Sequence, residues 1–576
     1  MPAPNPQRFR SAPAATLIGA IALLALTGAA LAPRPSASRS HEQESHFRFW
    51  PGNLVVSRSV YDNRASNVAV GTVLPPGCAA TTGGCAAATG ATNDGLFPYV
   101  FNNAQYDGSF GITSRILLDQ MTPAGVVLNT LEVPNSLDPR IGPNANQLVT
   151  SFSSKSEGAL HLSTSGRYVS FIDYVAPVNA IDVSNSGTPG APDATNPVGV
   201  SYYRAVAAVD ANGEFHFTKT NAYSGNNGRA AILDDRQDAK VFYTAGNAGN
   251  GSNPQPDGIL LGAGAQILNA LHLPLAEQTP ATPTPAASFS VTELGDKADK
   301  IGKDDNFRGL TIFNNVLYYT KGSGGNGVNT VYFVDTTGTA CPSGVGVPSA
   351  SATLPGPLAY NPATLATAGL PSNMCILNGF NTLLAKHASS GFPFGIWFDD
   401  ANTLYVADEG DGFASDSTLY AHAAAQTTAG LQKWVFDSTT GVWGLAYVLQ
   451  NGLNLGTPYA VPGYPTGNNS GVGGTGLPWA PATDGLRNIT GRTNPDGSVT
   501  IWAITSTVSG GGDQGADPNR LVAITDKLSA TDASTAAKEH FVTLRTAGFA
   551  EVLRGVSFAP GSVPDHGRDS SRDGHE

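Results

Sequence analysis

The feature that most constrains the fold is a repeated hairpin pattern: a small residue opens a short apolar run, which is followed by a turn and a second apolar run. The copy at Gly395 reads FPFGIWFDDANTLYVADEGDG. Five more copies occur, and successive copies begin between 67 and 93 residues apart; their small residues are Gly158, Ala230, Gly309, Asn488 and Gly555. Each interval holds one hairpin and leaves room for a second, so the repeat predicts units of four antiparallel strands.

Second hairpins are visible in several of these intervals. They begin at Tyr202 and Leu431, and a third runs from Asn519 to Thr546. The turns DANG and STTG in the first two supply the residues that tolerate positive φ in hairpin turns. Four antiparallel strands in each of several consecutive units are the sequence form of a β-propeller.

The last copy predicts how the ring closes. GVSFAP from Gly555 supplies one strand before the chain runs into a charged tail, and a blade needs more than one. GNLVVSRSVY from Gly52 reads as a second strand, and RILLDQMTPAGVVLNTLEV from Arg115 as a third and fourth. We therefore expect both termini to build one blade, which gives an all-β, six-bladed β-propeller without a free edge between its first and last units.

The stretch TLYVADEGDG from Thr403 resembles the second strand of NHL-type and SMP-30/gluconolactonase-like blades. The resemblance covers only the blade hairpins, and it implies a six-bladed propeller with a shortlist of activities. The widely separated acidic and Asn ligands of a lactonase metal site are not matched in this sequence, so none is transferred.

Composition narrows the class of partner. Charged residues make up 13% of the chain, against about 25% in an average soluble protein, and the net charge is -12. No run of lysine and arginine appears, so we expect no nucleic-acid partner.

Helical patterns are scarce, which favours one all-β body over several domains. We also expect a monomer.

The N-terminus has the layout of a secretory signal, with Arg8 and Arg10 before an apolar stretch from Ala14 to Ala32. A secreted or periplasmic protein is predicted, and a membrane anchor is the alternative if the segment is not cleaved. The predicted organisation is a signal peptide over 1–32, a disordered linker over 33–46, one propeller over 47–560 and a disordered charged tail over 561–576.

The four cysteines favour disulfides over a zinc site, because an exported chain is oxidised and no CxxC pair or nearby histidine is present. Three connectivities are open. The pairs Cys78 with Cys85 and Cys341 with Cys375 close the shortest loops.

The lengths of the connections point to one working face. Turns between first and second strands are short, whereas long links join second to third strands (residues 62–113 and 409–429, for example) and fourth to first strands (450–485). These long links share one face, and long loops are usually functional or disordered. Two insertions, in blades three and four, lie between third and fourth strands instead; they are exceptions that could be decoration without a function.

The residue before each repeat's small residue should lie where the innermost strand begins, at the upper rim of the central channel. These residues are Glu157, Arg229, Arg308, Phe394, Arg487 and Arg554. Arginine presents a fork of donors suited to carboxylate, sulfate or phosphate, so an anionic ligand in the funnel is one interpretation. The other is that the arginines pair with acidic residues such as Asp173, Asp408, Glu409 or Glu551 and hold neighbouring blades together.

The acidic stretch DEGDG has the wrong register for an EF-hand loop. Calcium bound by Asp408, Glu409, Asp411 or Asp416 is one hypothesis, and a solvated acidic turn is the other. His161 reads as a core or edge residue of a strand.

Two function classes remain open. The first is a binding protein that holds a small anionic molecule, or a polyhydroxylated ligand such as a polysaccharide, in the central funnel. The alternative is a metal-dependent hydrolase or lyase of the lactonase, esterase or phytase-like kind.

Overall fold

The chain divides into two units, Met1–His46 and Phe47–Glu576, and all the elements below belong to the second. The expected signal and linker lie outside the described residues, and no helix among the described residues is long and apolar enough to cross a membrane. The computed structural model describes residues 47–74, 93, 111–143, 145–152, 156–191, 198–236, 240–247, 264–269, 274–279, 282, 284–289, 294, 306–322, 327–364, 370–387, 391–413, 415–470, 475–511 and 514–564.

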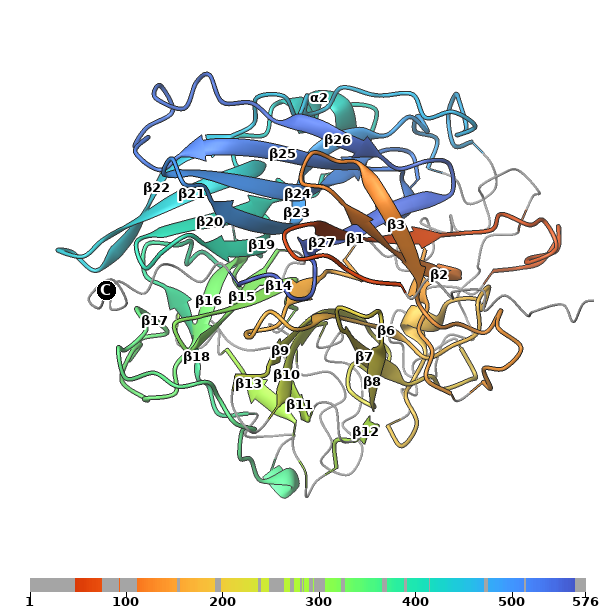
Figure 1. The fold of residues 1–576 in the computed structure, drawn as a ribbon, viewed down its shortest axis with the longest axis horizontal. Helices are drawn as coiled ribbons and strands as arrows, with labels where there is room; N and C mark the ends of the chain where they lie inside the picture. The colour runs from red at the N-terminus through yellow and green to blue at the C-terminus, as the bar shows by residue number, and fades with distance from the viewer. Residues whose placement is uncertain are drawn as a thin grey trace, which may run out of the picture. The chain divides into compact units, whose positions relative to one another are not determined.

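Six sheets, each with four antiparallel blade strands, are arranged in a ring, which confirms the predicted six-bladed β-propeller (Figure 1). Each innermost strand contacts the innermost strand of the next blade around the whole ring. From inner to outer strand, blade 1 contains β27 (Glu551–Phe558), β1 (Leu54–Val60), β2 (Thr113–Met121) and β3 (Val127–Glu132), with β4 (Thr150–Ser151) beside β2; blade 2 contains β5 (His161–Leu162), β6 (Val169–Tyr174), β7 (Arg204–Val209) and β8 (Phe215–Thr220).

The other four blades follow the same order. Blade 3 contains β9 (Gly228–Asp234), β10 (Val241–Gly246), β11 (Ala265–Asn269) and β13 (Pro285–Ala287); blade 4 contains β14 (Gly309–Phe313), β15 (Val316–Lys321), β16 (Thr330–Val334) and β18 (Met374–Leu377); blade 5 contains β19 (Pro393–Phe398), β20 (Thr403–Asp408), β21 (Gly430–Asp437) and β22 (Val442–Leu449); and blade 6 contains β23 (Ala482–Thr493), β24 (Ser498–Val508), β25 (Arg520–Lys527) and β26 (Val542–Thr546).

The two ends of the propeller share blade 1, as predicted. Strand β27 pairs antiparallel with β1, with Leu54 opposite Phe558 and Val56 opposite Val556, and β1 pairs with β2 on its other side. The C-terminal strand is therefore the innermost strand of a sheet whose other strands come from the start of the propeller.

Strands near the axis are buried on both faces because each sheet packs between two others. All six residues of β15, VLYYTK, are buried. Apolar clusters fill the spaces between blades, with Phe313 and Phe398 joining blades 4 and 5, and Tyr405 and Ile501 joining blades 5 and 6. This two-sided burial explains why the inner strands read as continuous apolar runs, as strands covered on both faces do.

Tight turns set the register of the hairpins on one face. In blade 4, Asn314 and Asn315 have φ of 48° and 59°, and they join Phe313 to Val316, which face each other across the ladder. Positive φ at both central residues is the type I′ arrangement, whose twist matches that of the two strands.

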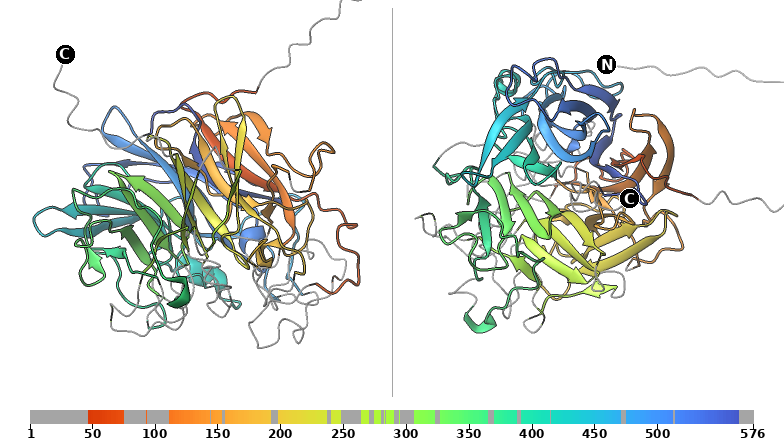
Figure 2. Two further views of the ribbon diagram at one scale, coloured as in Figure 1. Left: turned by 90° about the horizontal axis from the view of Figure 1, so that it is seen from below. Right: turned by 60° about the vertical axis from the view of Figure 1, so that its left-hand side comes forward.

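Long links gather on the opposite face. The second-to-third links of blades 2, 5 and 6 carry the short helices η3 (Val183–Asn185), α2 (Leu419–Ala424) and η7 (Gln514–Ala516). Figure 2 (left) shows all three on the same side of the ring. A helix in the 409–429 link was not expected from the sequence.

The two exceptional insertions are structured where they are described. The blade 3 insertion contains β12 (Leu275–Ala276), which pairs parallel with β8 of blade 2. The blade 4 insertion contains β17 (Val345–Gly346), which pairs parallel with β18, and the short helix η6 (Pro362–Thr364). Both insertions therefore extend sheets.

Candidate functional site

The six residues predicted to ring the channel are all enclosed by protein. Their exposed fractions run from 1% for Glu157 to 5% for Arg229, Arg308 and Arg554, so they do not stand at an open rim. Each lies three residues before a residue that lines the axial channel, among them Ile232, Thr311 and Thr490. The repeat thus places these six residues at one level of the ring, towards the face that carries the long links.

Glu157 is held by four donors. Its Oε2 accepts hydrogen bonds from the Thr150 hydroxyl and the Ser151 backbone N–H, both at 3.1 Å. Its Oε1 accepts from the Asn227 amide at 2.6 Å and from the Tyr174 hydroxyl. With both carboxylate oxygens occupied, Glu157 is a fixed part of the framework.

Arg554 is also occupied by structural partners. Its Nε donates to the Ser59 hydroxyl at 2.9 Å, and its Nη2 donates to the backbone carbonyls of Ser151 and Phe152, at 3.2 and 2.5 Å. These bonds tie the last strand to both β1 and β4. Arg554 therefore holds neighbouring strands together, which is a structural role.

Arg308 and Phe394 lie together. The guanidinium carbon of Arg308 is 6.0 Å from the centre of the Phe394 ring, at the limit of a cation–π contact, and its Nη1 donates to the Ser156 hydroxyl. The contact joins blades 4 and 5, and the hydrogen bond reaches the segment that precedes blade 2.

Arg229 and Arg487 keep donors without acceptors in the described part of the chain. Arg229 donates through Nη1 to the Asn306 side chain and the Phe307 carbonyl, but its Nε has no partner. Arg487 lies 3.6 Å from Glu409 through Nε, an ion pair longer than a hydrogen bond, and neither Nε nor Nη2 finds an acceptor. Buried polar groups are almost always hydrogen-bonded, so these three nitrogen donors are exceptional.

The charged residues around the axis shift one another's pKa values. Burial lowers the pKa of Arg229 well below its usual range, and the cation of Arg308 lowers it further, while Glu157, Tyr174 and Glu409 oppose the shift. These residues come from different blades, so the interactions bring the cluster together around the axis. We call Arg229, Arg308, Arg487, Arg554, Glu157 and Glu409 the axial cluster.

Two further carboxyl groups border the axial cluster. Burial, then the charge of Glu157, raises the pKa of Asp173 well above its usual range. Burial raises the pKa of Asp408 to about 8, although backbone N–H groups of Gly410 and Phe392 oppose the shift. The environment of both groups therefore favours the neutral acid, and for Asp408 this form prevails at neutral pH.

The DEGDG loop makes contacts within itself and with its neighbours. Asp408 accepts from the Gly410 N–H at 2.7 Å and from the Gln432 amide at 3.2 Å, whereas Asp411 is 2.8 Å from the ring of His422. Asp416 accepts from the Thr418 N–H on the surface. Calcium binding by this loop stays a hypothesis.

Within the described ranges, the one group of three side chains close enough to share a metal ion is Asp335, Cys341 and Cys375. Its two sulfurs are already joined in a disulfide, which confirms one of the expected pairs. Cys78 and Cys85 lie outside the described residues.

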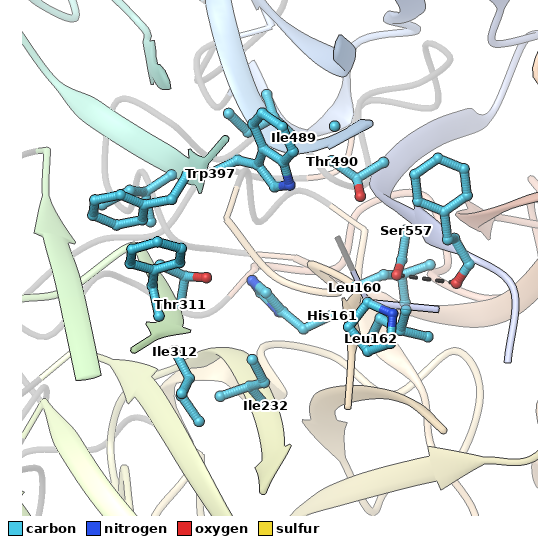
Figure 3. Close-up of a pocket in the computed structure, with 16 residues that line it drawn as sticks. Leu160, His161, Leu162, Ile232, Thr311, Ile312, Trp397, Ile489, Thr490 and Ser557 are labelled. Atoms are coloured by element: carbon cyan, nitrogen blue, oxygen red, sulfur yellow. Dashed lines mark hydrogen bonds between the residues drawn. The ribbon is translucent and has the colours of Figure 1, made fainter. Parts of the chain in front are cut away.

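A small cavity of about 70 Å³ lies on the axis beyond the axial cluster, and residues from all six inner strands line it (Figure 3). The imidazole of His161 points into it, and Trp397 and Thr311 also line it. Burial lowers the pKa of His161 to about 4, and its Nδ1 has no hydrogen-bond partner among the described residues. The sequence predicted a core or edge position for His161 in this strand, but the repeat pattern did not show that its side chain faces the channel.

No protein-family model matches this chain, and no curated protein matches it. Among solved structures, a mutant of the Synechocystis apocarotenoid oxygenase matches with 8% sequence identity and a TM-score of 0.18. The match covers 78% of this chain and 59% of that protein. A similarity at this level supports no statement about fold or activity.

Proposed function

We propose that this chain is an exported β-propeller protein that binds a small oxyanion at the axial cluster. The observation that carries the proposal is the set of buried N–H groups of Arg229 and Arg487 that have no acceptor among the described residues. An unsatisfied buried donor costs about 1–3 kcal/mol, and more when it is charged. A bound anion would supply the missing acceptors.

The charge of the cluster supports the same proposal. Among the described residues Arg487 forms one ion pair, with Glu409 at 3.6 Å, and Arg229 forms none, while the environment of Asp173 and Asp408 favours their neutral forms. Uncompensated charge in a buried site costs several kcal/mol per ion. A bound anion would therefore stabilise the folded protein as well as fill the site.

The chemistry of the ligand follows from the donors. Guanidinium groups present planar forks that match carboxylate, sulfate and phosphate oxygens. The arginines are no more than 5% exposed, which favours a compact anion over a polysaccharide chain. The ligand class is therefore a small carboxylate, phosphate or sulfate.

The alternative function, a metal-dependent hydrolase or lyase, rests on the resemblance of TLYVADEGDG to lactonase-like blades. Such an enzyme needs several oxygen ligands around one cation. Asp408 and Asp411 instead make the hydrogen bonds described above, and Glu409 pairs with Arg487. No contact in the described part of the chain favours this alternative over anion binding.

Calorimetric titration with orthophosphate, sulfate and succinate at low ionic strength tests the proposal. We expect one site per chain for at least one anion. Arg487→Gln and Arg229→Gln should each weaken binding at least tenfold, because charge-assisted hydrogen bonds contribute about 1.5–3 kcal/mol. Arg140→Gln is the matched control, since Arg140 pairs with Asp138 on the surface. Equal binding by all three variants, or none by the unmodified protein, would exclude the site.

A further inference from the structure

A second cavity, of about 470 Å³, opens between blades 4 and 5 on the face that carries the short hairpin turns. Its walls include Phe313, Tyr318, Phe398, Phe436 and Trp443. The volume lies within the range of small-molecule pockets in proteins. None of the described residues that line this cavity is charged.

The aromatic rings form a continuous wall. Phe313 and Phe398 stack with centroids 4.5 Å apart and planes 7° from parallel, and Tyr318 packs on Phe398 at 4.7 Å. Trp443 contacts Phe398 at 6.0 Å and Phe436 at 5.3 Å. Aromatic rings at these spacings offer faces and edges that a further ring can contact.

Two polar groups on this wall lack partners within the described chain. Tyr318 is 5% exposed, and its hydroxyl makes no hydrogen bond there; burial raises its pKa, so the group stays protonated. The indole N–H of Trp443 likewise makes none, although the backbone N–H of that residue donates to Asn378. Neither atom is among the buried polar atoms without a partner, so both reach solvent and can bond a ligand in the cavity.

The blade 4 insertion supplies the opposite wall. Val347 to Ala350 line the cavity and follow directly after β17, which pairs with β18. The disulfide joins Cys375 of β18 to Cys341, just before β17, so it fixes the segment that leads to this wall. The insertion therefore shapes a pocket, a role that loop length did not predict.

We propose that this cavity binds an uncharged aromatic molecule that carries a hydroxyl group. The ring would pack against the aromatic wall, and the hydroxyl would bond to Tyr318 and Trp443. An ion is disfavoured, because no charged side chain among the described lining residues would compensate for its lost hydration. This site is separate from the axial cluster and does not depend on it.

Calorimetric titration with 2-naphthol and with its charged counterpart 2-naphthoate tests the proposal. We expect 2-naphthol to bind one site and 2-naphthoate to bind at least tenfold more weakly. Tyr318→Phe removes a hydroxyl without a partner in the described chain, so it should leave folding intact and weaken 2-naphthol binding about fivefold.

Ala401→Trp tests the location, because Ala401 is exposed at the edge of the cavity and a larger side chain would fill it. We expect 2-naphthol binding to be lost in this variant and retained in Ala533→Trp, a control at an exposed alanine of blade 6. Circular dichroism checks the fold of each variant. Absence of 2-naphthol binding, equal affinity for 2-naphthoate, or unchanged binding by folded Ala401→Trp would overturn the proposal.

Discussion

Val56 of the first strand lies opposite Val556 of the last strand, and both side chains are fully buried. This pairing joins the two ends of the propeller within one sheet. A closed ring leaves no exposed edge between its first and last units, so every blade packs against two neighbours. Stability of the whole ring should therefore depend on this one seam.

A charge in the seam should unfold the protein more readily. We expect Val556→Asp to lower the free energy of unfolding by at least about 3 kcal/mol, because a carboxyl group replaces a buried apolar side chain. Val563→Asp is the control, since Val563 is 87% exposed. Urea denaturation measures both, and an equally small effect in the two variants would argue against a structural seam.

The stability of the fold should depend strongly on Arg554 and only weakly on Arg229. Arg554→Gln should cost about 3 kcal/mol of unfolding free energy, because it leaves carbonyls of β4 and its link without donors. Arg229→Gln should change it by less than about 1 kcal/mol in buffer without oxyanions. The variant loses the hydrogen bonds of Arg229. That loss is offset because the variant also removes a buried cation, which the surroundings of Arg229 disfavour. Thermal and urea unfolding in such a buffer compare the two; similar losses would show that Arg229 is also structural.

Asp408 should make stability depend on pH. Its pKa is about 8 in the fold, above the ordinary value of 3.8, so the folded state holds a proton that the unfolded state releases. Stability from this group is therefore present at low pH and is lost as pH rises from about 4 through 8, by up to about 1.4 kcal/mol per pH unit.

The comparison with Asp408→Asn isolates that effect from His161, whose lowered pKa acts in the opposite direction below pH 6.5. We expect the unfolding free energy of the unmodified protein to fall between pH 6.5 and 8.5 more steeply than that of the variant. Parallel curves would mean that Asp408 is already ionised in the folded protein.

The disulfide between Cys341 and Cys375 spans 34 residues. Replacing both cysteines by serine should lower the free energy of unfolding by about 2–4 kcal/mol, because the unfolded chain gains freedom. Non-reducing peptide mapping identifies the link, and calorimetric unfolding gives the cost. An unchanged melting temperature, with the link present in the unmodified protein, would contradict this estimate.

The fold could be predicted because its determinants are periodic. One incomplete repeat at Gly555 was enough to place the ends of the chain in one blade, and the spacing of small residues gave the number of blades. The boundaries of individual strands were harder to predict. Gly158 has φ of 72°, which interrupts the extended backbone before β5, while β23 begins at Ala482, ahead of the expected start at Asn488.

The site was predictable only in part. Strand register placed the four arginines at equivalent positions, and the structure keeps them at one level. Which of them retain open donors depends on partners such as Ser156 for Arg308 and Asn306 for Arg229, which lie outside the repeated strands. The cavity between blades 4 and 5 depends on the path of an insertion, which has no periodic signal at all.

The central claim is that buried arginines of the axial cluster hold an oxyanion. Diffraction at the selenium absorption edge, from crystals soaked in selenate, tests it most directly. We predict an anomalous difference peak within hydrogen-bond distance of Arg229 Nε or Arg487 Nη2, and no such peak in Arg487→Gln crystals. Selenate bound only on the surface, with the axial cluster empty of anomalous density, would contradict the claim.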